Sequence, residues 1–127
     1  MPHYTVHISE TALDGTVEPK LIGALADAVG SVYGERFRSL VGVDVIGIPP
    51  HRRGIGGLPT DKIAPSVTLS MREAAYHVPG VPDAIPRLIG ATTDAVAAVL
   101  GEDVRAQTLV SVTGVPDGRS GVAGAVA

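Results

Sequence analysis

A proline directly follows Met1, and it is the residue of this chain with the most distinctive chemistry. If Met1 is removed, Pro2 begins the chain with a secondary amine. An α-amino group has a pKa of about 7.7–8.0, and desolvation or a nearby cation lowers that pKa further. Such a nitrogen is a neutral base close to working pH. Pro2 is therefore one candidate for a base once Met1 is lost, whereas retained Met1 would make this nitrogen an amide.

A second candidate region is the basic, glycine-rich segment of residues 51–62, which begins with His51, Arg52 and Arg53. The glycines that follow lie between two expected strands, and no helix is expected after them. They therefore match neither the dinucleotide-binding fingerprint nor the phosphate-binding loop of nucleotide hydrolases. As structure, the segment predicts a turn or hairpin.

The composition excludes several kinds of site and partner. The chain has no cysteine, so disulfides, thiol nucleophiles and cysteine-ligated zinc are excluded. His3 and His7 share one face of an expected strand, but no third ligand has suitable spacing, and no metal site is predicted. The net charge of −3 and the pI near 5.7 argue against binding to nucleic acid or to anionic membranes. With no apolar run of about 18 residues, the chain is expected to be soluble and cytoplasmic.

The elements that must position Pro2 follow a repeating plan. Residues 2–8 are rich in β-branched and aromatic side chains and predict a strand. From Val17 onward, apolar residues recur on one helical face, with Thr16 as the expected N-cap and Gly34 as the stop. The apolar positions of this face are Leu21, Ile22, Leu25, Ala28, Val29 and Val32. A second strand is predicted over residues 40–48.

The second half of the chain shows the same plan. Residues 66–71 predict a strand, a helix follows from an N-cap at Asp83 to a stop at Gly101, and residues 104–113 predict the last strand. The buried face of this helix is expected to hold Ile85, Leu88, Ile89, Thr92, Val96 and Val99. Pro19 precedes Gly34 by 15 residues, and Pro86 precedes Gly101 by the same 15. The chain is therefore expected to be one domain over residues 1–127, with repeats at 2–62 and 65–113 and a small-residue tail at 114–127.

Two β-α-β units with right-handed crossovers predict an α+β (α/β two-layer) fold, in which a four-stranded mixed sheet carries two helices on one face. With both helices on one face, a sheet rich in Val and Ile on both faces would leave its other apolar face uncovered. The least costly cover for that face is a second copy of the same chain, so self-association is expected. The tail is expected to be frayed or to lie on a neighbouring molecule.

The Met-Pro start, the tandem β-α-β plan and the glycine loop at residues 54–57 together resemble the tautomerase superfamily. The resemblance covers nearly the whole chain, and its doubled length is similar to the fused members, which are trimers. It implies a cofactor-independent tautomerase with Pro2 as the catalytic base or acid. Pro65 stands at the equivalent place in the second repeat, but its nitrogen lies inside the chain and is an amide.

The resemblance also assigns the binding residues. The segment Met71-Arg72-Glu73 is similar to the one that carries a substrate arginine in the dehalogenase members, so Arg72 is expected to bind the substrate. The second arginine position of those members is Ala75 here. The arginines that hold a diacid in 4-oxalocrotonate tautomerase are absent, and the position of one of them aligns with Gly42. This disfavours such dicarboxylates, although Arg53 would return a cation to the pocket.

The residues and the resemblance together predict a keto–enol tautomerase acting on a small α-keto or enol acid, assembled as a homotrimer. Arg53 is expected to help Arg72 from a neighbouring subunit. His51, Arg52, Glu73 and Tyr76 are candidates for supporting roles around the site. An imine-forming, decarboxylating, hydrating or dehalogenating enzyme of the same superfamily is the nearest alternative, and the glutamate needed to activate water for dehalogenation is absent. A binding or scaffold trimer without catalysis is the third alternative.

Overall fold

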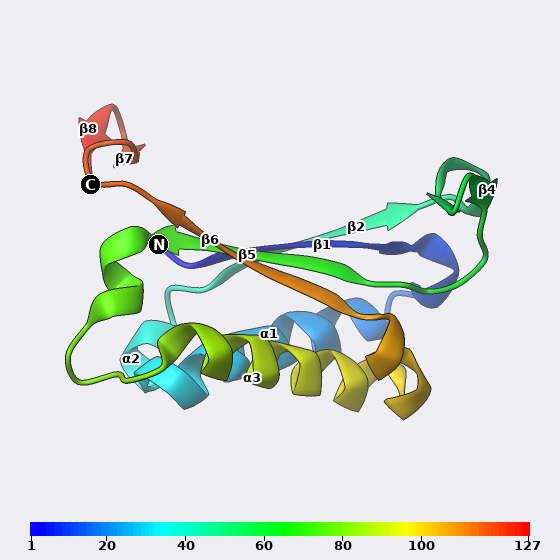
Figure 1. The fold of residues 1–127 in the computed structure, drawn as a ribbon, viewed down its shortest axis with the longest axis horizontal. Helices are drawn as coiled ribbons and strands as arrows, with labels where there is room; N and C mark the ends of the chain where they lie inside the picture. Colours follow the sequence, from blue (N-terminus) through cyan, green and yellow to red (C-terminus); the bar gives the residue numbers. More distant parts are fainter.

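The sheet of this computed structural model, which describes all residues 1–127, has four strands in the order β2-β1-β5-β6 (Figure 1). The two outer pairs, β1 with β2 and β5 with β6, are parallel, and the central pair of β1 with β5 is antiparallel. The strands are β1 (His3–Ser9), β2 (Gly42–Ile48), β5 (Ser66–Arg72) and β6 (Leu109–Val115). The mixed sheet expected from the sequence is confirmed.

Two long helices, α1 (Val17–Tyr33) and α3 (Ala84–Leu100), lie side by side on one face of this sheet (Figure 1). Each connects the two parallel strands of its own repeat. A short helix, α2 (Glu35–Arg38), follows α1. The tandem β-α-β plan and the two-layer fold class are therefore confirmed.

The ends of the helices follow local chemistry. Both α1 and α3 stop at a glycine with positive φ, Gly34 at 99° and Gly101 at 109°, a backbone region that glycine adopts without strain. At the start of α1, Thr16 is the N-cap by position, but its side chain makes no capping hydrogen bond. The Asp14 carboxylate accepts from the backbone N–H of Thr16 and Val17 instead, at 2.8 and 3.0 Å. The Asp14 carboxylate thus accepts from two amides at the helix start that have no acceptor within the helix.

The core lies between the helices and the sheet. Alternate residues of the two central strands are buried there, together with one stripe of each helix, and the largest are Tyr4, Ile8, Leu21, Leu25, Leu69 and Leu88. The Tyr4 hydroxyl and the Thr92 hydroxyl form a hydrogen bond of 2.7 Å inside this core, which links β1 to α3. The expectation that Ile85 and Ile89 are buried is wrong, since they are 37% and 38% exposed on the flank of α3.

The open face of the sheet differs from the expected apolar surface. Residues of the central strands that alternate with the buried ones point away from the helices, and they are polar: His3, Thr5, His7, Ser66, Thr68 and Ser70. The expectation of Val and Ile on both faces is therefore wrong for β1 and β5. Their apolar residues face the helices, and these imidazole and hydroxyl side chains occupy the other side.

Three element boundaries also differ from those expected from the sequence. Residues 104–107 are not a strand but part of the 3₁₀ turn η4 (Glu102–Gln107), because the chain must return from the end of α3 to the sheet edge. Val104 is buried in this turn. The second strand begins at Gly42 rather than at residue 40. The last strand continues to Val115, inside the segment assigned to the tail.

Two small hairpins extend from opposite ends of the sheet (Figure 1). The first, β3 (Gly54–Ile55) with β4 (Leu58–Pro59), is the hairpin expected from the glycine-rich segment. The second, β7 (Gly121–Val122) with β8 (Ala125–Val126), shows that the tail folds back on itself instead of fraying. None of the helices combines the length and the apolarity needed to cross a bilayer.

Candidate active site

Pro2 is buried at the point where β1 begins. Its carbonyl oxygen accepts a hydrogen bond of 3.0 Å from the backbone N–H of Gly42, at the start of the neighbouring β2. Proline has no N–H to offer a strand ladder, so the first position of a strand suits it. The sheet thus fixes the backbone of Pro2 through its carbonyl and leaves its nitrogen outside the ladder.

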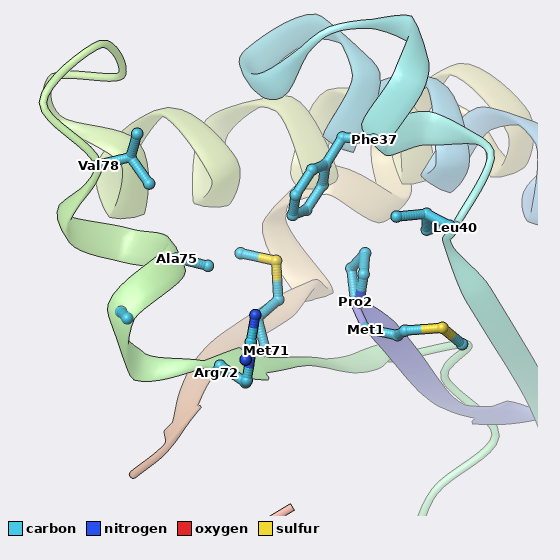
Figure 2. Close-up of a pocket in the computed structure, with 9 residues that line it drawn as sticks. Met1, Pro2, Phe37, Leu40, Met71, Arg72, Ala75 and Val78 are labelled. Atoms are coloured by element: carbon cyan, nitrogen blue, oxygen red, sulfur yellow. The ribbon is translucent and has the colours of Figure 1, made fainter. Parts of the chain in front are cut away.

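The Pro2 ring forms one wall of a cavity of about 370 Å³ (Figure 2). Most of the wall is apolar. Its residues come from the start of the chain, the segment after α1, the end of β5, and the 3₁₀ turn η3 (Glu73–His77) with Val78 directly after it. The lining residues are Met1, Pro2, Phe37, Leu40, Met71, Arg72, Ala74, Ala75 and Val78. We call this space the Pro2 cavity.

Arg72 supplies the only charged side chain of the Pro2 cavity. It is the last residue of β5, where the alternation of the strand buries Met71 in the core and leaves Arg72 exposed. Its guanidinium makes no ion pair and no side-chain hydrogen bond within the chain. A guanidinium that is free of internal partners can bind a carboxylate through two parallel hydrogen bonds.

Two tyrosines hold the η3 wall of the Pro2 cavity in place. The Tyr33 hydroxyl donates a hydrogen bond of 2.7 Å to the Ala75 carbonyl, and the Tyr33 ring stacks on Phe37 with centroids 4.7 Å apart. The Tyr76 hydroxyl donates to the Thr113 carbonyl of β6, also at 2.7 Å. Burial raises the pKa of the Tyr76 hydroxyl, which therefore keeps its proton as a donor. Tyr76 supports the cavity wall from behind and does not line it.

Glu73 does not pair with Arg72. Its Oε1 lies 2.9 Å from Nε2 of His77, one turn along η3. Glu73 is also absent from the lining of the Pro2 cavity. Although Glu73 is the next residue in the chain, its carboxylate pairs with His77, and the charge of Arg72 is not neutralised within the protomer.

The three basic residues of the other candidate segment lie at the far end of the sheet in the same protomer. Ser9, at the end of β1, pairs with Ile48, at the end of β2, and η2 (Pro50–Arg52) follows directly. The Arg53 Nη2 donates to the Ala64 carbonyl, and its Nη1 is buried without a partner. His51 and Arg52 are exposed. One protomer thus brings Pro2 and Arg72 together but keeps His51, Arg52 and Arg53 away from them.

His3 lies next to Pro2 in sequence but points to the open face of the sheet. Its Nε2 lies 3.0 Å from the Asp44 carboxylate on β2. No group of three or more His, Asp or Glu side chains is arranged to hold a metal ion.

The apolar wall of the Pro2 cavity is not predicted by the residue pattern of the sequence. Phe37, Leu40 and Val78 come from connecting segments, where residue patterns do not indicate which side chains meet. The only available signal was the scarcity of aromatic residues, since Phe37 is the single phenylalanine of the chain. Chemically, the cavity combines a proline at the amino-terminal end of the chain, one free cation and a largely apolar surround.

No protein-family model and no curated protein sequence matches this chain. Among solved structures, it is similar to a fused 4-OT described as an asymmetric trimer, with a TM-score of 0.80, 22% identity, and coverage of 98% of this chain and 94% of that chain. Pt0534 inactivated by 2-oxo-3-pentynoate gives a TM-score of 0.78 at 17% identity, with coverage of 98% and 94%.

A third similar structure is N1, a member of the cis-3-chloroacrylic acid dehalogenase family, with a TM-score of 0.79 and 17% identity. Its alignment covers 98% of this chain and 82% of that chain. The likeness extends over nearly all of the chain, and it confirms the fold expected from the resemblance to the tautomerase superfamily.

Proposed function

We propose that this protein is a tautomerase that interconverts the keto and enol forms of a small acid, with the Pro2 nitrogen as the proton carrier. The observation that carries the proposal is the Pro2 cavity, in which the buried Pro2 and the unpaired Arg72 share one largely apolar space. The similarity of the whole chain to fused 4-OT supports the same activity.

The proposed reaction begins after Met1 has been removed. The neutral Pro2 nitrogen takes the proton of an enol hydroxyl, and the electron pair of the O–H bond becomes the carbonyl while the C=C bond shifts. The protonated Pro2 then returns a proton to the carbon that has gained electron density. No proton is gained or lost overall, and the proposed step requires no cofactor.

Arg72 is proposed to bind the carboxylate of the substrate and to stabilise the negative charge of the enolate. That charge develops only during the reaction, so a fixed cation lowers the barrier most where it faces the developing charge. A substrate that covers the apolar wall would displace water from it, which strengthens this interaction and favours the neutral form of the Pro2 amine.

We further propose that the active assembly is a homotrimer, as the solved fused 4-OT structures are described. The proposal gives Arg53 a role that it lacks within one protomer. Its segment projects from the end of the sheet opposite to Pro2, and a neighbouring subunit would bring it to the mouth of the Pro2 cavity (Figure 1).

The test combines intact mass with an ultraviolet assay of phenylenolpyruvate and 2-hydroxymuconate ketonisation. The proposal expects loss of the Met1 mass and turnover that falls at least about 100-fold in Pro2→Ala. A purified protein that retains Met1, or turnover that is unchanged in Pro2→Ala, would contradict it.

An imine-forming enzyme is the second candidate, because an apolar surround also makes a neutral amine nucleophilic. It would trap substrate irreversibly on Pro2 in the presence of borohydride, whereas simple proton transfer would not. Hydrolytic dehalogenation has less support, since no carboxylate lines the Pro2 cavity to activate water. A scaffold without catalysis is the remaining alternative, and Pro2-dependent turnover excludes it.

A further inference from the structure

We infer that the substrate of the Pro2 cavity is a monocarboxylate whose other end is uncharged and apolar. The inference rests on the proposed function and deepens it, because it names the class of acid. It depends on how charge and apolar surface are distributed around Pro2.

Within one protomer the cavity offers one cation, Arg72, and no other ionic partner, and Arg53 of the proposed trimer would reach only its mouth. Apart from Met1, which the proposed function removes, six of its eight lining residues are hydrophobic, and Arg72 is the only charged side chain among them. A second carboxylate that points toward the apolar edge of Phe37 and Val78 would lose water without gaining a cation or a hydrogen-bond donor from a side chain. Burial of an unpaired charge is strongly unfavourable, so a diacid is disfavoured.

Part of the apolar wall lies on the side away from Arg72. In the close-up view, Arg72 lies at one edge of the cavity, Phe37 and Val78 line the opposite edge, and Pro2 and Leu40 lie to one side (Figure 2). A ligand that places its carboxylate on Arg72 therefore extends past Pro2 toward these side chains. Leu40 and Val78 are 46% and 43% exposed, so an apolar group at this edge would remove their surface from water.

On its other side Arg72 borders the carboxyl-terminal hairpin. A second, adjacent cavity of about 320 Å³ shares only Met1 and Arg72 with the Pro2 cavity, and its remaining lining comes from the carboxyl-terminal hairpin: Ser120, Gly121, Val122 and Ala127. The site thus has a charged end at Arg72 and an apolar end at Phe37, which matches an acid with an apolar tail.

The first test compares the kcat/KM of the Met1-free protein for phenylenolpyruvate, a monocarboxylate, and 2-hydroxymuconate, a dicarboxylate. We expect at least a tenfold preference for phenylenolpyruvate. Ala75→Arg adds a cation to the cavity wall and should shift the ratio toward 2-hydroxymuconate by at least tenfold. Ala98→Arg adds the same charge on the exposed surface of α3 and should leave the ratio unchanged.

The second test measures binding, and it does not depend on turnover. Calorimetric titration should show that 3-phenylpropanoate binds at least tenfold more tightly than adipate, and that Arg72→Ala removes the binding. Equal or reversed affinities, or binding of neither acid, would overturn the inference. Pro2-dependent turnover with a preference for the diacid would contradict the inference alone. Tight binding of 3-phenylpropanoate without turnover of either enol would contradict the proposed function alone.

Discussion

The two ends of the sheet are related by the internal repeat, and they differ in chemistry. Pro2 directly precedes β1, Pro65 directly precedes β5, and both prolines are buried. The Pro2 carbonyl accepts from Gly42 N–H at 3.0 Å, and the Pro65 carbonyl accepts from Leu109 N–H at 2.9 Å. The two prolines therefore occupy the same place in two copies of one backbone arrangement.

What surrounds each proline is different. The Pro65 nitrogen is an amide joined to Ala64, and the carbonyl of Ala64 is occupied by the Arg53 guanidinium. At the other end, Arg72 has no partner and faces an open cavity beside Pro2. The repeat thus supplies the scaffold twice, whereas a releasable amine and a free cation coincide only at the Pro2 end. Repetition of a fold does not imply repetition of its chemistry.

The strongest test of this difference blocks the Pro2 nitrogen and compares the result with a change at Pro65. Two extra residues, Gly-Ser, between Met1 and Pro2 turn the nitrogen into an amide and should reduce turnover by at least about 100-fold, the usual contribution of a general base. Pro65→Ala, with folding checked by circular dichroism, should retain turnover within about threefold. Equal losses in the two proteins would show that the ends are not chemically distinct.

The two cations provide the next test. Arg72→Ala should lower kcat/KM by about 10- to 100-fold, since a charge-assisted hydrogen bond contributes about 1.5–3 kcal/mol. Lys20→Ala removes one positive charge from the exposed surface of α1 and serves as the control, with unchanged kcat/KM expected. If both substitutions had the same effect, Arg72 would act through net charge and not through contact with substrate.

The core also departs from the repeat. Thr92 of α3 stands where α1 has Leu25, and Tyr4 corresponds to Val67, so a hydrogen bond replaces an apolar contact. Thr92→Ala leaves the buried Tyr4 hydroxyl unpaired and should cost about 1–3 kcal/mol in urea unfolding at fixed protein concentration. The double variant Tyr4→Phe with Thr92→Val restores an apolar pair and should recover most of that loss. No recovery would indicate that packing, not the hydrogen bond, sets the cost.

The same pair predicts the smallest effect, a loss of stability in alkali. Burial raises the pKa of Tyr4 to about 12, above its model-peptide value of about 10. The folded protein holds this proton more tightly than the unfolded chain, so the contribution is complete below about pH 10 and is lost as pH rises through about 12. Tyr4→Phe should weaken the alkaline decline without abolishing it, because burial also raises the pKa of Tyr76. Superimposable pH profiles of the two proteins would exclude a role for Tyr4.

The sequence predicts the repeated elements well because local patterns specify them. The expected N-caps at Thr16 and Asp83 and the glycine stops at Gly34 and Gly101 match the observed ends of α1 and α3 to the residue. The prediction that Ile85 and Ile89 are buried is wrong, since only a narrow stripe of each helix meets the four-stranded sheet. Periodicity shows that a face is apolar but not how far that face is rotated from the sheet.

The candidate site was predicted in part. The resemblance to the tautomerase superfamily pointed to Pro2 and Arg72, and the fold brings these two residues to one cavity. The wall formed by Phe37, Leu40 and Val78 was not foreseen, because irregular connections have no sequence period that shows which side chains meet. The placement of Arg53 stays a prediction that concerns a neighbouring subunit.

The most direct test of the central claim is to locate the adduct formed by 2-oxo-3-pentynoate, the compound that inactivates the structurally similar Pt0534. A neutral amine adds to the triple bond conjugated with the ketone, and a C–N bond forms while the adjacent carbon takes up the proton. Peptide mass spectrometry should find one equivalent on the Pro2 nitrogen of the Met1-free protein, with parallel loss of turnover. Protein with the Gly-Ser insertion should remain unlabelled. Inactivation without a modified Pro2, or labelling equally distributed over other residues, would contradict the claim that Pro2 carries the chemistry of this fold.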